Sequence, residues 1–303
     1  MSELIETIKL GKSIAKNLAM GNSAVVSLYQ RRRGQQGYSA DKDQVDYPLG
    51  VFRKHATALA PLRESGLHGT DVLEIGPGGN VGVSLLMLLA GAKSATCLDV
   101  MPWIQGSGPD ALYPALVEAA AQEPETYLVA PALRERARTE PEAVARELLE
   151  RITYLCPMDI ATTTLPDASQ DVIFSHACFE HFGDPAGSIA QIARLLRPGG
   201  VTSHQVDLRD HRDFSHPLEF LRYGESVWHL ANSNRPSGVR NRWRAPEYRV
   251  AFEQRGLEVV ALHATDTTTV TEEMRHKFHA HFQAMRLEDL AIIGILLVAR
   301  KRS

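Results

Sequence analysis

The sequence predicts an α/β fold in which a mostly parallel sheet of seven strands carries helices on both faces, and three observations lead to that prediction. Seven runs of apolar and β-branched residues are spaced along the chain, and helical patterns separate most of them. The first run passes directly into a glycine-rich turn over residues 76–79. A later helical pattern stops at Pro198, Gly199 and Gly200, which together form a strong helix terminator.

Residues 1–66 are expected to form an N-terminal helical segment that precedes the main domain. Apolar residues recur at helical spacing up to Met20, and a second helical pattern covers about 49–65. Residues 31–44, between these patterns, are polar and contain glycine, which predicts a loop or a lid that includes Tyr38. An appended amphipathic helix can also serve dimerisation, so a homodimer is an alternative use of this segment.

Residues 67–303 are expected to form the main domain, with insertions at about 101–151 and 209–244. Ligands bind at the carboxyl ends of the strands in sheets of this kind, so these ends are where the chemistry is expected. The strands are predicted over residues 71–76, 94–100, 152–160, 171–177, 201–208, 257–265 and 291–300. The helices of the main domain are predicted over 80–92, 186–200, 245–255 and about 272–286.

Composition excludes several classes of protein. The formal net charge of −3 argues against non-specific nucleic-acid binding, which depends on a strong positive field. The three cysteines form no CxxC pair, so reduced thiols in a cytoplasmic protein are expected. The longest apolar run, residues 291–299, is half as long as a membrane span, and charged residues interrupt the N-terminal apolar pattern. Binding to nucleic acid or to a membrane is therefore not expected.

The glycine turn is compatible with several nucleotide-binding folds, and its details separate them. A dinucleotide fold needs the pattern G-x-G-x-x-G/A, but Gly76 and Gly78 are followed by Val81, where close helix packing requires a small residue. A P-loop requires a G-K-[ST] ending, which does not follow this turn. Both interpretations are therefore disfavoured.

Acidic residues at strand ends accompany the turn. Glu74 stands two residues before Gly76, Asp99 ends the second predicted strand, and Asp159 follows the third. A carboxylate can bind two vicinal ribose hydroxyls through charge-assisted hydrogen bonds, and glycine lets a backbone approach a ligand closely. This combination points to a ligand that contains a nucleoside.

These markers, together with three later segments, resemble one family. The later segments are the fourth strand and its exit at 171–185, the helix and turn "IARLLRPGG" at 192–200, and the closing run "LAIIGILLVARK" at 290–301. The chain resembles the class I S-adenosylmethionine-dependent methyltransferases from Asp71 to Lys301. The resemblance implies a Rossmann-like fold with an antiparallel last strand, S-adenosyl-L-methionine as the cofactor, and S-adenosyl-L-homocysteine as the product.

The resemblance also implies which residues bind the cofactor. It assigns Glu74 to the cofactor's ammonium group, Asp99 to the ribose and Asp159 to the adenine, and Asn80 stands where the family often has a third glycine. The complete set of implied cofactor-binding residues lies at the ends of the first four strands: Glu74, Gly76, Gly78, Asn80, Asp99, Val100, Asp159, Ile160, Ser175 and His176.

A hydroxyl acceptor must lose a proton, and the candidate proton acceptors lie after the fourth and fifth strands. His176, Asp207 and His211 are predicted as catalytic residues around the substrate. His181 and His204 are interpreted as structural. No required metal is predicted, because the spacing of the histidines matches no strong metal signature.

The second insertion is expected to bind the substrate, because arginine suits carboxylate or phosphate and aromatic rings suit sugars. Among its residues are four arginines close together, Arg235, Arg240, Arg242 and Arg244, and the aromatic residues Tyr223, Trp228 and Trp243. The predicted function is O-methylation of a small molecule, either a natural product or a sugar-containing metabolite. An RNA or protein methyltransferase stays open as the alternative, and a non-catalytic binding protein is disfavoured by the intact cofactor markers.

Overall fold

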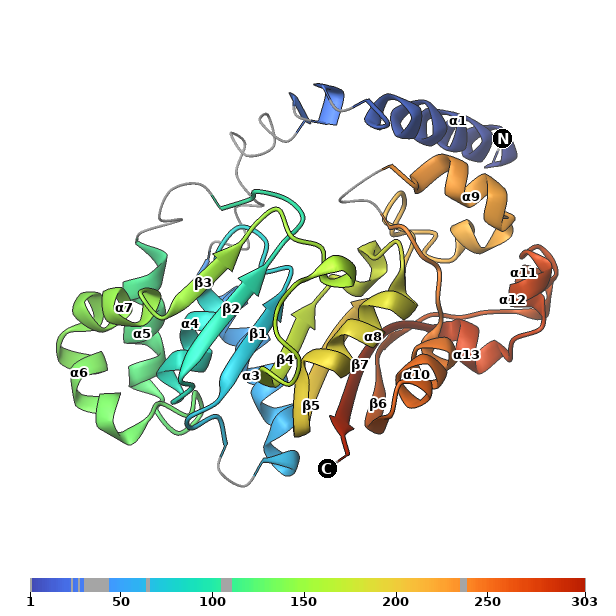
Figure 1. The fold of residues 1–303 in the computed structure, drawn as a ribbon. Coiled ribbons are helices and arrows are strands. Elements are labelled where there is room, and N and C mark those ends of the chain that lie inside the picture. Colours follow the sequence, from blue (N-terminus) through green and yellow to red (C-terminus); the bar gives the residue numbers. More distant parts are fainter. Residues whose placement is uncertain are drawn as a thin grey trace.

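The computed structural model describes residues 2–22, 24–26, 28–29, 44–63, 66–104, 111–234 and 239–302. These residues form a seven-stranded sheet in the order β3-β2-β1-β4-β5-β7-β6 (Figure 1). The first five strands are parallel, and β7 runs antiparallel to both of its neighbours, which confirms the predicted sheet. The strands are β1 (Asp71–Ile75), β2 (Ser94–Leu98), β3 (Ile152–Leu155), β4 (Gln170–His176), β5 (Leu196–Asp207), β6 (Leu257–Thr267) and β7 (Ile292–Lys301).

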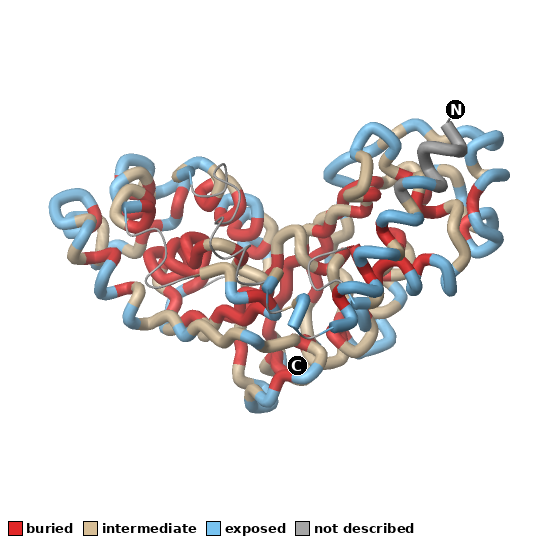
Figure 2. Tube along the Cα trace, turned by 90° about the horizontal axis from the view of Figure 1, so that it is seen from above, coloured by how far each residue is buried: buried red, intermediate tan, exposed pale blue. Residues whose placement is uncertain are grey.

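Helices cover both faces of the sheet, and the alternation of side chains along each strand supplies both interfaces. In β1, Val72 packs into the hydrophobic cluster on one face, whereas Leu73 packs into the cluster on the other. Figure 2 shows the buried residues concentrated in the strands and in the helices beside them. The first face is covered by α3 (Asp46–Leu59), α4 (Gly82–Leu89) and α5 (Leu112–Gln122), and the second by α8 (Pro185–Leu195) and α10 (Ala245–Gln254).

The two insertions have different roles in packing. The first continues from α5 through η3 (Pro131–Leu133), α6 (Arg134–Thr139) and α7 (Pro141–Leu149), and its apolar residues extend the first cluster. The second contains η6 (Glu219–Arg222) and α9 (Glu225–Asn232), which share a third cluster with residues 278–293. The remaining short helices are η2 (Ala60–Leu62), η4 (Ile160–Thr162), η5 (Phe179–His181), α11 (Glu272–His276), α12 (Ala280–Gln283) and α13 (Leu287–Ala291).

The N-terminal segment divides into two parts that pack in different places. α3 belongs to the sheet core, whereas α1 (Ser2–Met20) lies against α9 of the second insertion (Figure 1). The Asn17 side chain fixes this contact, because its Nδ2 donates to Leu230 O at 2.9 Å and its Oδ1 accepts from Asn234 N at 2.8 Å. Tyr38 and most of the predicted loop lie outside the described residues.

Two predicted helices end earlier than expected. α8 ends at Leu195, and β5 begins at Leu196, so the terminator Pro198-Gly199-Gly200 lies within a strand, where Gly199 has φ +77°. The predicted helix over 272–286 is interrupted, because His279 is extended and its N–H donates to Leu221 O at 2.8 Å. In both places, backbone hydrogen bonds to neighbouring elements replace those of a longer helix.

Candidate functional site

The turn after β1 requires glycine at its first position. Gly76 has φ +72° and Gly78 has φ +73°, which is the left-handed region that glycine adopts without strain. A Cβ on Gly76 would lie 2.4 Å from Sγ of Cys178, so no side chain fits there. The Gly76 N–H donates to Leu98 O at 2.8 Å, which ties the turn to the end of β2.

Asp99 lies directly after β2 and holds this turn in place. Its carboxylate accepts a hydrogen bond from Gly78 N at 3.3 Å and another from Met101 N at 2.8 Å. Burial raises the pKa of Asp99 to about 6, because the loss of water around the carboxylate outweighs the hydrogen bonds from backbone amides, which lower the pKa. The carboxylate therefore favours a ligand that donates hydrogen bonds to it.

Asp99 faces a cavity, called here the Asp99 cavity, which Gly76, Val100, Asp159 and Ile160 also line. Asp159 accepts a hydrogen bond from Ala161 N at 2.9 Å and so caps η4, which presents the buried Ile160 beside it. The ends of β1, β2 and β3 thus supply one continuous lining, as the sequence predicts.

Glu74 occupies the other side of the turn, in a second cavity. This Glu74 cavity is lined by Tyr47, Gly76, Asn80 and His176 as well. The buried Glu74 carboxylate accepts a hydrogen bond from Ser84 Oγ at 2.5 Å, yet burial raises its pKa to about 7. A cation placed in this cavity would stabilise the charged carboxylate.

Asn80 and Ser175 have structural uses within this region. Asn80 Oδ1 accepts from Gly82 N at 2.9 Å at the start of α4. The Ser175 hydroxyl is fully buried and bonds His204 Nδ1 at 2.8 Å, so a cofactor contact from Ser175 would have to use its backbone. His204 is buried against Phe179, and burial lowers its pKa to about 3, which agrees with the structural role expected for it.

His176 ends β4 and faces a histidine that the sequence analysis does not single out. Its Nδ1 lies 3.4 Å from Nε2 of His55 on α3, and the His55 Nδ1 lies 2.8 Å from Ser203 Oγ. His55 is fully buried, and burial holds its pKa well below the usual value, with the nearby His176 lowering it further. His55 is therefore neutral at physiological pH. The sequence around His55 does not predict its contact with His176, because His55 lies on the apolar face of a helix, as a core residue does.

Asp207 and His211 lie together at the exit of β5, as predicted, but Asp207 is strongly paired. Arg209 donates to both of its carboxylate oxygens, at 2.8 Å and 2.7 Å, and His211 Nε2 lies 3.3 Å away. Burial alone would raise the pKa of Asp207, but the bonds from Arg209 and His211 bring it well below its usual range. A carboxylate with so low a pKa is a weak proton acceptor, so this geometry does not favour the role of base for Asp207.

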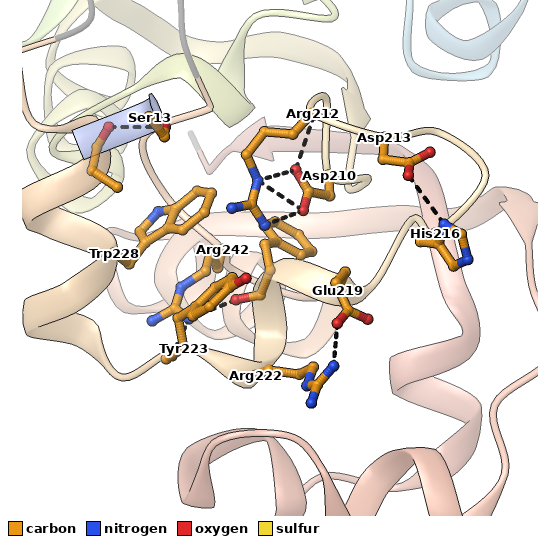
Figure 3. Close-up of polar contacts among 12 residues, drawn as sticks. Ser13, Asp210, Arg212, Asp213, His216, Glu219, Arg222, Tyr223, Trp228 and Arg242 are labelled. Carbon is orange, nitrogen blue, oxygen red and sulfur yellow. Dashed lines mark hydrogen bonds and ion pairs between the residues drawn. The ribbon is translucent and has the colours of Figure 1, made fainter. Parts of the chain in front are cut away.

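Two of the arginines expected to bind substrate have internal partners instead. Arg242 donates to Phe220 O at 3.0 Å and to the Glu225 carboxylate at 2.6 Å, and its guanidinium packs on Trp228 (Figure 3). Arg244 is fully buried and donates to the carbonyls of Leu208, Leu290 and Ile292. The guanidinium groups of Arg242 and Arg244 therefore have structural roles. This corrects the expectation that these two arginines bind the substrate.

Arg240 remains available in this group, and Arg235 lies outside the described residues. Arg212 pairs with Asp210 at 2.5 Å, and its guanidinium lies over the rings of Tyr223 and Trp228. Figure 3 shows this ion pair. The described part of the second insertion therefore holds its own core together with arginine and aromatic side chains.

The residues around the turn fit S-adenosylmethionine. The Asp99 and Glu74 cavities meet at Gly76, where the absent Cβ keeps the backbone accessible. Buried carboxylates face the two cavities, one suited to hydroxyl donors and the other to an ammonium group. Among the described residues, no group of three or more His, Cys, Asp or Glu side chains could hold a metal ion. No helix in that part of the chain is long and apolar enough to cross a membrane.

Comparison with solved structures finds similar folds at low identity. A candidate sarcosine dimethylglycine methyltransferase from Galdieria sulphuraria is 16% identical, with 88% of this chain and 91% of that chain covered, at a TM-score of 0.49. A methyltransferase from Haloferax volcanii, solved with the activator Trm112, is 19% identical over 84% of this chain and 92% of that one, at a TM-score of 0.44.

A phosphoethanolamine N-methyltransferase from Haemonchus contortus, solved with phosphomonomethylethanolamine and S-adenosylhomocysteine, is 16% identical at a TM-score of 0.42. That match covers 82% of this chain and 53% of the other. No curated protein sequence matches the chain significantly.

A family model described as a methyltransferase domain matches residues 46–262, from the start of α3 into β6. This match covers well over half of the chain. The protein therefore belongs to the class I S-adenosylmethionine-dependent methyltransferases, and S-adenosylmethionine is its cofactor.

Proposed function

We propose that the protein transfers a methyl group from S-adenosylmethionine to an oxygen of a small molecule, either a natural product or a sugar-containing metabolite. The observation that carries this proposal is the His55–His176 pair beside the Glu74 cavity. It supplies a nitrogen base at the end of β4, where a hydroxyl acceptor would need to lose its proton.

The pair defines which nitrogen of His176 exchanges protons. If His55 Nδ1–H donates to Ser203 Oγ, then His55 Nε2 accepts from His176 Nδ1–H. This tautomer makes His176 Nε2 the basic nitrogen. Because His55 is buried with a strongly lowered pKa, it stays neutral across the physiological range, so one of its ring nitrogens can accept a hydrogen bond throughout.

In this mechanism the chain's own residues bind and orient the reactants. S-adenosylmethionine, when held by the residues of the two cavities, would supply an electrophilic methyl group, with its sulfur as the leaving group. His176 Nε2 takes the hydroxyl proton, a contribution of roughly 10²- to 10⁴-fold in rate. Holding the reactants in line contributes more, because positioning can lower the activation barrier by about 7–11 kcal/mol.

We assign cofactor binding to the residues of the two cavities. Gly76 and Gly78 form the close backbone approach, and Asp99 binds the ribose hydroxyls with Val100 beside it. Asp159 and Ile160 flank the adenine, and Glu74 faces the ammonium group.

We further propose that α1 and α9 together form a lid above the carboxyl ends of the strands. Both helices lie on that side of the sheet, and Asn17 joins them through hydrogen bonds (Figure 1). A lid there would exclude water during methyl transfer. α3, the other helix of residues 1–66, is not included in this lid, because it belongs to the core.

The test is the His176→Ala variant of the full chain, assayed for S-adenosylhomocysteine release with a panel of hydroxylated natural products and sugars. We expect turnover to fall at least 100-fold while calorimetric affinity for S-adenosylhomocysteine changes less than threefold. His263→Ala, on the exposed part of β6, is the matched control and should behave as wild type. Wild-type turnover in His176→Ala would refute the role of His176 as the base.

A further inference from the structure

A third cavity adjoins the Asp99 cavity and has a volume of about 480 Å³. Gly183 and Arg240 line both cavities, so the two meet at these residues. Around it lie charged, imidazole and aromatic side chains, including Glu225, His229, Trp243, Glu247 and His281. We call it the Arg240 cavity.

Among the described residues, Arg240 differs from the other arginines nearby in how few partners its guanidinium has. Arg242 pairs with Glu225 and with backbone carbonyls, and Arg244 binds three carbonyls. Within the described residues, the Arg240 guanidinium makes one hydrogen bond, from Nη2 to Ser233 O at 3.1 Å, and no ion pair. Its Nε is buried without a partner. A half-buried guanidinium with unused donors favours an anionic ligand.

The backbone around Arg240 fixes the position of this charge. Its N–H donates to Glu180 O at 2.9 Å, and its carbonyl accepts from Trp228 Nε1 at 3.2 Å. The guanidinium lies directly against Gly183, where a Cβ would come within 2.5 Å of Nη2. The charge is thus placed before any ligand arrives, which lowers the entropic cost of binding.

The acidic residues of the lining each have a partner within the protein. Glu225 bonds Arg242 at 2.6 Å, and Glu247 lies 3.1 Å from His281 Nε2. Trp243 and Phe282 provide apolar surface in the same cavity. The lining thus combines one unpaired cation with a wall suited to a carbon skeleton.

We propose that the Arg240 cavity binds the methyl acceptor through a carboxylate or phosphate group held by Arg240. This proposal rests on the proposed function and narrows its substrate class to acidic small molecules. The guanidinium fork matches either anion with two parallel hydrogen bonds. The carbon skeleton of the acceptor lies against Trp243.

The test is calorimetric titration of inorganic phosphate, and separately of acetate, into the full chain saturated with S-adenosylhomocysteine at low ionic strength. We expect at least one of these anions to bind, and its affinity to fall at least tenfold in Arg240→Gln. Arg240→Lys keeps the positive charge but loses the planar guanidinium group, so its anion affinity should lie between those of wild type and Arg240→Gln. Arg249→Gln is the matched control, because Arg249 lies on α10, outside the lining of the Arg240 cavity, and pairs with Glu253.

Three outcomes would overturn the proposal. The first is that no anion binds to the wild-type protein, and the second is equal anion affinity in wild type and in a folded Arg240→Gln variant. The third is a tenfold loss of S-adenosylhomocysteine affinity in Arg240→Gln with anion binding unchanged, which would assign Arg240 to the cofactor. Neither readout uses methyl transfer, so failure of the His176 experiment would leave anion binding intact.

Discussion

Two aspartates lie at the carboxyl ends of parallel strands and meet opposite electrostatic surroundings. Asp99, after β2, is buried with backbone amides as its partners, and its pKa is raised to about 6. Asp207, at the end of β5, is clamped by Arg209, and its pKa lies well below the usual range. Asp99 and Asp207 thus occupy equivalent places in the fold, but the Asp99 carboxylate can accept hydrogen bonds from a ligand, whereas the charge of Asp207 is neutralised by Arg209.

This difference separates the two halves of the strand-end surface. On the side of β1, β2 and β3, the carboxylates of Glu74 and Asp99 lie beside the glycine turn and have no ion pair within the part of the chain that the structure describes, so a ligand must supply the matching donors and positive charge. Beyond β5, Arg212 and Arg242 pair with acids and Arg244 binds carbonyls, whereas the Arg240 guanidinium makes a single hydrogen bond to a carbonyl among the described residues. Position in the fold indicates where a ligand binds, and the partners of each charge decide what it can bind.

The largest expected effect is at the glycine turn. Gly76→Ala would place a Cβ 2.4 Å from Cys178 Sγ at φ +72°, so the turn must shift. We expect at least a 100-fold loss of S-adenosylhomocysteine affinity by calorimetry. Gly69→Ala is the matched control, because Gly69 also has φ +72° but its Cβ would contact nothing within 4 Å. An equal loss of affinity in both variants would show that backbone strain, and not the contact with Cys178, is responsible.

Glu74 makes the stability of the cofactor-free protein depend on pH. Its folded pKa of about 7 exceeds the unfolded value of 4.5, so its stabilising contribution is complete below pH 4.5 and is lost as pH rises through about 7. This difference in pKa between the folded and unfolded states corresponds to about 3 kcal/mol of unfolding free energy. In denaturant titrations, we expect Glu74→Gln to gain stability relative to wild type between pH 4.5 and 8. A pH-independent difference would contradict the raised pKa.

The Asp99→Asn variant tests whether the Asp99 carboxylate binds the ribose hydroxyls. Loss of the charge weakens hydrogen bonds from ligand hydroxyls, so S-adenosylhomocysteine affinity should fall about tenfold, in line with roughly 1.5 kcal/mol for a charged hydrogen bond. The amide keeps one acceptor for Gly78 N, which limits damage to the turn. Unchanged affinity, measured by calorimetry, would assign the ribose contact to another residue.

Asp207→Asn should have the smallest effect. Since Arg209 already makes Asp207 a weak proton acceptor, we expect turnover to change less than threefold in the acceptor-panel assay. A 100-fold decrease would return Asp207 to the role of base and remove the contrast with Asp99. The thermal unfolding temperature of the variant distinguishes this result from simple loss of structure.

The sequence predicts the cofactor side well because that side is encoded locally. Glu74 and Gly76 stand two residues apart, and Asp99 and Asp159 each follow a recognisable strand. The acceptor side is assembled from distant positions, and His55 meets His176 across 121 residues. Nothing in the local pattern around His55 distinguishes it from a core residue, because the contact arises only when α3 packs on the sheet.

The arginines of the second insertion show a different limit. Composition identifies Arg240, Arg242 and Arg244 alike as potential anion binders, since each has the same fork. Only the folded chain shows that carbonyls of Leu208 and Leu290 lie within reach of Arg244. The end of α8 also depends on contacts that form only in the folded chain. The helix ends at Leu195, where pairing of β5 with the sheet begins, and not at Pro198, where the sequence predicts its end.

The contact between α1 and α9 has a consequence for how the protein is made. Asn17 bonds the backbone of Leu230, a partner 213 residues later in the chain. During synthesis the first helix leaves the ribosome long before its partner exists, and short isolated helices are only marginally stable in water. Contacts of such long sequence separation slow folding. The docking of α1 is therefore expected to be among the last steps of folding, after the sheet has formed.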